Sequence, residues 1–218
     1  SIWGGADRDP AWVEESDIRL KVVNVLLRRL SARDQEERSQ AAIALGKTRI
    51  SAAFGPLRKM FEHGTVADRR AAAVALGYLG EPVAAPVLSG YLTRAGADPA
   101  ERAYAAIGLG LLAAPESVPT LEKVLARSLA YRGRGIVELE VAVATALGVL
   151  GQERSADLLG RVVATKNGID GSVRAAAAVA LGRINADRSM SILLAAVSVG
   201  DVELRRAAAQ ALGLTGRG

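Results

Sequence analysis

A Leu-Gly pair that returns six times at a nearly constant interval constrains this 218-residue chain more than any other feature. Successive glycines of these pairs are 31, 33, 38, 34 and 31 residues apart. The pairs are Leu45-Gly46, Leu76-Gly77, Leu109-Gly110, Leu147-Gly148, Leu181-Gly182 and Leu212-Gly213. A period of this length is typical of one supersecondary unit copied along a solenoid, in which each copy buries its apolar face against its neighbours. The pattern predicts an all-α solenoid of about six antiparallel helix pairs.

Aligning the six copies on the glycine, as position 0, shows the face that each copy buries. Position −1 is Leu and position −4 is Ala in all six copies, and these positions share one side of a helix. We expect the glycine to end this helix, helix B, by adopting left-handed dihedrals. A leucine at +11 begins the apolar face of a second helix, helix A of the next copy. Each unit therefore contains helix A, a turn, helix B and another turn.

The B-helix segments 68–77 (DRRAAAVALG) and 172–182 (SVRAAAAVALG) carry a family resemblance. The chain resembles the HEAT-repeat family, in the short variety typified by phycobilisome-lyase HEAT-like repeats, over roughly residues 17–216. The resemblance implies a right-handed superhelix whose concave face is lined by the B helices, and an internal Asp–Arg ladder between repeats. We divide the chain into an N-terminal cap or linker (1–16) and a repeat domain (17–218).

Composition excludes several kinds of chemistry. The sequence has no Cys, so disulfides and thiol nucleophiles are excluded, and its one histidine, His63, is interpreted as a cation near a helix end. No phosphate-binding or dinucleotide-binding glycine motif occurs. We therefore predict no catalytic residue, no cofactor and no metal site. No apolar run reaches the roughly 18 residues of a membrane span. The composition is of bacterial type, and the start at Ser1 suggests a fragment of a larger protein.

An arginine occupies position −8 in five copies and is replaced by Glu140 in the fourth. These arginines are Arg38, Arg69, Arg102, Arg174 and Arg205. We expect them to pair with acidic residues at the turn into helix B. Those acids are Glu37, Asp68, Glu101, Asp170 and Asp201. The alternative is a basic ladder that binds phosphates or an acidic peptide.

The outward positions of the B helices, −7, −6, −3 and +1, are candidates for partner binding. They combine apolar side chains with scattered Arg and Tyr, which is typical of protein contacts. The predicted partner-binding residues on this surface are Arg70, Val74, Tyr78, Tyr104, Ile107, Val179 and Arg206. The alternative is a wrong helix phase, in which case these residues belong to the core.

An insertion at 126–137 lengthens the approach to the fourth B helix. It contributes four further candidates, Arg127, Tyr131, Arg132 and Arg134. An Arg/Tyr/Gly segment can wrap phosphates or stack on a base. An insertion on a tolerant edge of the solenoid, without a function, is the alternative.

Three functions follow, in order of preference. The first is a non-enzymatic scaffold that holds a protein or peptide on the concave B-helix face. The second is binding of nucleic acid or phosphate through the concave-face arginines and the 127–134 loop. The third, implied by the resemblance, is a scaffold subunit of a phycobilisome-lyase-like enzyme. Because no capping helix follows Gly213, we also expect the native protein to continue there or another chain to cover that end, including by self-association.

Overall fold

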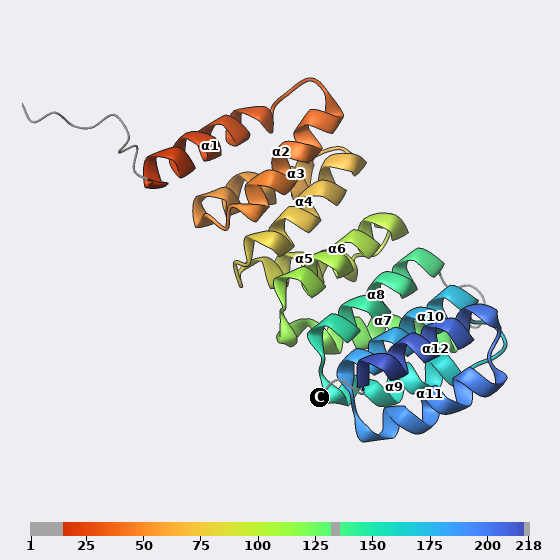
Figure 1. The fold of residues 1–218 in the computed structure, drawn as a ribbon. Helices are drawn as coiled ribbons and strands as arrows, with labels where there is room; N and C mark the ends of the chain where they lie inside the picture. Colours follow the sequence, from red (N-terminus) through yellow and green to blue (C-terminus); the bar gives the residue numbers. More distant parts are fainter. Residues whose placement is uncertain (1–14, 132–135, 216–218) are drawn as a thin grey trace, which may run out of the picture.

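The computed structural model describes residues 15–131 and 136–215, and all regular secondary structure within them is helical (Figure 1). The odd-numbered helices are the A helices: α1 (Glu15–Arg29), α3 (Phe54–His63), α5 (Ala84–Leu92), α7 (Val118–Tyr131), α9 (Ala156–Ala164) and α11 (Asp187–Val199). The even-numbered helices are the B helices: α2 (Gln35–Lys47), α4 (Val66–Leu79), α6 (Pro99–Leu112), α8 (Val137–Leu150), α10 (Gly171–Ile184) and α12 (Val202–Thr215). Short 3₁₀ turns, η1 (Ser51–Ala53), η2 (Pro115–Ser117) and η3 (Glu153–Ser155), precede α3, α7 and α9. The predicted all-α solenoid of six helix pairs is confirmed.

The two kinds of helix form two layers. Each B helix packs along its length against the next B helix, from α2 through to α12 (Figure 1). The A helices pack on their own B helices and make few direct contacts with one another. In a curved stack of helix pairs, the helices of the inner layer lie closer to one another than the helices of the outer layer do. The B helices therefore form the inner layer and the A helices the outer one.

The leucines and alanines of the repeat fill the space between the layers. Leucines at −1 and alanines at −4 are fully buried in the first five repeats, and so are the leucines at +11 of the A helices. Burying one such leucine contributes about 1.5–3 kcal/mol to folding. Phe61 and Tyr91 add an aromatic contact between α3 and α5, with ring centroids 4.9 Å apart. The predicted core is thus confirmed in the first five repeats, whereas in the sixth Ala209 is exposed and Leu212 is half-buried.

The position-0 glycines do not end the B helices, so that prediction was wrong. All six lie inside a helix, one or two residues before its end, and the first five face position −2 of the next B helix. A Cβ added to Gly46 would lie 2.3 Å from the carbonyl oxygen of Ala75, and one on Gly77 would lie 2.6 Å from that of Gly108. Equivalent approaches link Gly110 to Ala146, Gly148 to Ala180 and Gly182 to Ala211. The glycines allow neighbouring B helices to approach closely.

The B helices end near position +3, where the chain turns into the left-handed region. The φ angles there are 54° at Arg49, 78° at Gly80, 55° at Ala113, 64° at Gly151 and 52° at Asn185. Glycine occupies only two of these five positions. The helix stop therefore has a weaker sequence signal than the Leu-Gly pair, which explains the error.

Helix α1 begins at Glu15, while residues 1–14 lie outside the described part, so the boundary between 1–16 and 17–218 stays a prediction. Within the described residues, no helix combines the length and the apolar character that crossing a membrane requires.

Candidate functional site

The predicted partner-binding residues lie on the surface of the B layer that we call the B face, which consists of the residues at positions −7, −6, −3 and +1 that are not buried. Arg70, Val74, Tyr78, Tyr104 and Val179 are half-buried there, and Ile107 and Arg206 are exposed. Residues at −5, −4 and −1 are buried in the first five repeats, and Tyr104 and Val179 pack partly against that core. None of the seven predicted residues is fully buried, and binding of a partner by these side chains stays a prediction.

Cations and tyrosines of adjacent repeats meet on the B face. The guanidinium of Arg70 in α4 lies 5.7 Å from the ring centroid of Tyr104 in α6, and Lys47 Nζ in α2 lies 5.4 Å from that of Tyr78 in α4. Arg70 also approaches Asp98, with Nη2 3.7 Å from Oδ1. Such contacts hold the tyrosines in place. Sequence reasoning missed Lys47, although its +1 position in the first repeat was a signal that could have identified it.

The middle of the B face exposes apolar side chains. Ile107 is 37% exposed, Leu111 39% and Val149 48%. Leu111 and Val149 occupy position +1 of adjacent repeats. Their side chains stand beside the position-0 glycines of the preceding repeats, because a Cβ on Gly77 would lie 2.8 Å from Leu111 Cβ and one on Gly110 4.0 Å from Val149 Cβ. The glycine contacts thus align these side chains into one apolar strip.

The arginine column serves mainly the structure of the solenoid. Arg38 pairs with Asp68 of the next repeat (Nε–Oδ1 2.9 Å), Arg69 with Glu101 (Nη2–Oε1 2.6 Å) and Arg174 with Asp201 (Nη1–Oδ2 3.0 Å). Arg102 and Arg205 bond instead to the backbone carbonyls of Leu92 and Gly200. Of the other two expected acids, Glu37 pairs with Arg29, and Asp170 caps α10 through the Ser172 amide. Three rungs of the expected ladder are present among the described residues.

Glu101 is the most connected of these acids. It is buried, accepts hydrogen bonds from Nε and Nη2 of Arg69, and accepts another from the hydroxyl of Tyr91. Burial, together with this hydrogen bond and the charge of Glu101, raises the pKa of the Tyr91 hydroxyl. Helices α4, α5 and α6 are thereby joined at a single carboxylate.

The ladder is broken between the third and fourth repeats. Asp68 and Glu101 occupy position −9 of their repeats, whereas the fourth repeat has Leu139 at that position and offers Arg102 no acid there. Burial lowers the pKa of Arg102, and the nearby charge of Arg127 lowers it further. Glu140 takes the arginine position in α8 and is buried, and its Oε1 has no hydrogen-bond partner among the described residues.

The residues of the predicted insertion are only partly described. Arg127 is exposed near the end of α7, and Tyr131 is the last residue of that helix. Arg132 and Arg134 lie outside the described residues. A role of the 127–134 segment in phosphate or base binding stays a prediction.

The described residues hold no group of three or more His, Asp or Glu side chains that could bind a metal ion. His63 is exposed, with Nε2 3.8 Å from Oε2 of Glu62. What the arrangement offers is a shaped surface with apolar, aromatic and cationic side chains.

Comparison with known proteins agrees with this geometry. The family model of HEAT repeats matches residues 23–97, and the model of the PBS lyase HEAT-like repeat matches residues 101–127 and 173–198. These two models together span more than half of the chain. The chain therefore belongs to the HEAT-repeat proteins, and some of its repeats are of the PBS lyase type.

Solved structures refine this assignment. The chain is related to phycocyanin lyase, because it is 29% identical to a chain in the complex of CpcE and CpcF of phycocyanin lyase from Nostoc sp. PCC7120. That match has a TM-score of 0.66 and covers 89% of this chain and 77% of the other. An engineered protein, 18% identical with a TM-score of 0.51, matches over 89% of this chain and 96% of its own length and shows the fold alone. No curated protein sequence matches the chain.

Proposed function

We propose that this HEAT-repeat protein is a non-catalytic scaffold subunit of a two-protein assembly related to phycocyanin lyase, and that it holds its protein partner on the B face. The observation that carries this proposal is the match to the CpcE–CpcF complex, which extends over 89% of the chain at 29% identity. That relative is a complex of two different proteins. The likeness therefore favours a protein partner, and it supports the lyase-related scaffold more than a general peptide-binding module.

The B face has the chemistry of a protein contact. Its exposed Ile107, Leu111 and Val149 form an apolar strip, and Tyr104 stands beside it against Arg70. Apolar strips rimmed by polar groups mark contact surfaces, and Tyr and Arg are frequent anchors in them. A surface held by repeated backbone contacts loses little conformational entropy on binding. The mechanism is geometric: the solenoid presents a rigid surface that orients a partner.

The nucleic-acid alternative gains no support from the ladder, because Arg38, Arg69 and Arg174 are paired with acids. Their charges are largely neutralised within the solenoid. Binding of a DNA or RNA duplex would have to use exposed arginines such as Arg206, and its affinity would fall steeply with salt.

The test measures binding of the chain to purified CpcE and to purified CpcF of Nostoc, in separate calorimetric titrations. We expect one of the two to bind. Ile107→Asp and Val149→Asp should each weaken that binding at least tenfold, because an apolar contact would then have to desolvate a charge. Val83→Asp is the matched control, because Val83 is 51% exposed at the start of α5 in the outer layer. Circular dichroism should show all three variants folded.

Binding of neither protein would contradict the assembly that we propose. Equal losses in the B-face variants and in Val83→Asp would contradict the location of the contact.

A further inference from the structure

A second site that the repeat pattern did not indicate lies at the junction of the last four helices. A pocket of about 350 Å³ is bounded by the end of α9, by α11 and by residues of α10 and α12. Small side chains at Ala164, Ala195 and Ala196 leave this space open between the larger Val199 and Leu204. Its volume lies within the range of sites that hold small organic ligands.

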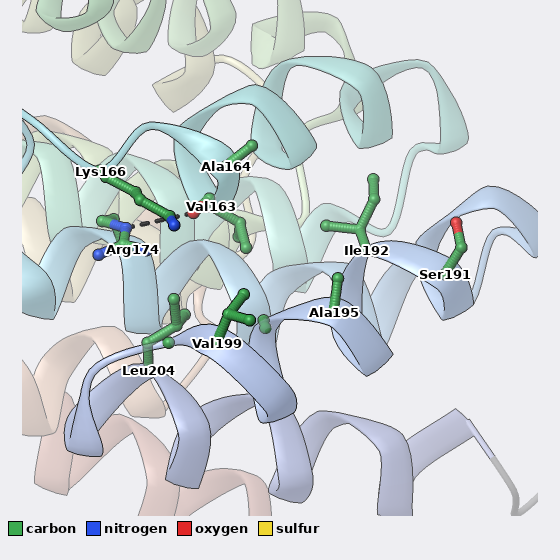
Figure 2. Close-up of a pocket in the computed structure, with 11 residues that line it drawn as sticks. Val163, Ala164, Lys166, Arg174, Ser191, Ile192, Ala195, Val199 and Leu204 are labelled. Carbon is green, nitrogen blue, oxygen red and sulfur yellow. Dashed lines mark hydrogen bonds between the residues drawn. The ribbon is translucent and has the colours of Figure 1, made fainter.

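The two ends of the pocket differ in chemistry. Figure 2 shows Lys166 and Arg174 together at one end, with Leu204 near Arg174, Ile192 and Ser191 at the other end, and Val199 between the two ends. The wall is otherwise almost entirely aliphatic. The pocket is therefore cationic at one end and, apart from Ser191 beside Ile192, apolar along the rest of its length.

The two cations are held differently. The side chain of Arg174 is 9% exposed, donates from Nε to the Val163 carbonyl at 3.2 Å and pairs through Nη1 with Asp201 at 3.0 Å. Lys166 is exposed, follows the last turn of α9, and makes no hydrogen bond or ion pair within the described part of the chain. Arg174 is thus locked in place, whereas the ammonium group of Lys166 is available at the pocket end.

We infer that this pocket binds a small aliphatic carboxylate, with its head at Lys166 and its chain lying over Val199 and Ala195 toward Ile192. A neutral aliphatic ligand would leave the ammonium group without a partner, and a dianion would place its second charge against aliphatic walls. A single carboxylate on an apolar chain suits both parts of the pocket. Its head forms a charge-assisted hydrogen bond with Lys166, and its chain buries apolar surface against the aliphatic wall. This inference rests on the pocket alone and does not depend on the proposed protein partner.

The probes are decanoate and 1-decanol, which share one chain and differ in the charge of the head group. In calorimetric titrations of the whole chain, we expect decanoate to bind at one equivalent and at least tenfold more tightly than decanol. Lys166→Glu should remove that preference. Ala195→Phe should weaken both ligands at least tenfold, because the ring fills the pocket. Lys123→Glu in α7 is the control, because Lys123 is exposed and lies outside the pocket.

Three results would overturn the inference: no decanoate binding at millimolar concentration, equal affinity for the two probes, or unchanged decanoate affinity in Ala195→Phe. Both pocket substitutions are at exposed positions, so circular dichroism should show folded protein. Binding of CpcE or CpcF should be unchanged in these variants, which separates a failure of this inference from a failure of the proposed function.

Discussion

Arg38 of α2 donates two parallel hydrogen bonds to the carboxylate of Asp68 in α4, with Nε–Oδ1 and Nη2–Oδ2 distances of 2.9 and 3.2 Å. The same carboxylate accepts the Thr65 amide at 3.0 Å, as part of a capping box at the start of α4. The Asp68 side chain therefore caps the start of α4 and joins two repeats, so its charge should matter for the stability of the stack.

The first prediction concerns acid stability. Burial alone would raise the pKa of Asp68, but hydrogen bonds from Arg38 and Thr65 outweigh it and lower the pKa. The stabilisation is therefore present above the unfolded-state value near 4 and is lost as pH falls through the lower folded-state value. Asp68→Asn should cost about 2–4 kcal/mol at pH 7, because Arg38 then lacks its charged partner. Urea unfolding at pH 7 and pH 3 measures this effect.

The difference between Asp68→Asn and wild type should shrink at pH 3. Glu116→Gln, at an exposed carboxylate in η2, should change stability by less than about 0.5 kcal/mol at either pH. A constant cost of Asp68→Asn across pH would contradict the role of the charge.

The second prediction compares two position-0 glycines, Gly77 and Gly213, which differ in how closely the next helix approaches them. Gly77→Ala should destabilise the protein by about 1–3 kcal/mol, because its Cβ would lie 2.6 Å from the Gly108 carbonyl oxygen and force α4 and α6 apart. Gly213→Ala has no atom within 4 Å of the added Cβ and should stabilise α12 by about 0.5–1 kcal/mol. Chemical denaturation of both variants measures the contrast. Effects of the same sign would show that the glycines do not serve close packing.

The third prediction tests where the B helices end. Ala113 has a φ of 55°, a conformation that glycine adopts without steric cost. Ala113→Gly should stabilise the protein by about 1 kcal/mol, measured as a rise in the denaturation midpoint. Ala126→Gly, at an exposed right-handed position inside α7, should destabilise it by about 1 kcal/mol. Destabilisation by Ala113→Gly would contradict the left-handed stop.

The fourth prediction compares two buried glutamates in adjacent repeats. Glu140 has an Oε1 atom without a partner, whereas Glu101 accepts hydrogen bonds from Arg69 and Tyr91. Glu140→Met should therefore stabilise the protein by about 1–3 kcal/mol, because a buried carboxylate with one unsatisfied oxygen is replaced by an apolar side chain of similar length. Glu101→Met should destabilise it by about 3–5 kcal/mol, because Arg69 loses its partner. Thermal unfolding of both variants distinguishes them, and destabilisation by both would show that Glu140 has a structural partner.

Much of the fold could be predicted because each repeat carries its own pattern. The spacing of Leu76 and Ala73 defined the buried face of α4, and the same spacing also placed Val74 and Tyr78 on the B face. The roles of the glycines could not be predicted, because a glycine needed for left-handed dihedrals and one needed for close approach have the same sequence signature. The structure separates the two roles. In the first repeat the left-handed residue is Arg49, with a φ of 54°, whereas Gly46 is needed for close approach, because an added Cβ would lie 2.3 Å from the next helix.

The sequence by itself determined the period, the helix pairs and the face that each helix buries, because these depend on spacings within a few turns. Tertiary structure decided which residues about thirty positions apart meet. It paired Arg38 with Asp68, Arg69 with Glu101 and Arg174 with Asp201. Those contacts depend on how far and at what angle each repeat is displaced from the previous one. That displacement is a property of the packed layers and is not encoded in any single repeat.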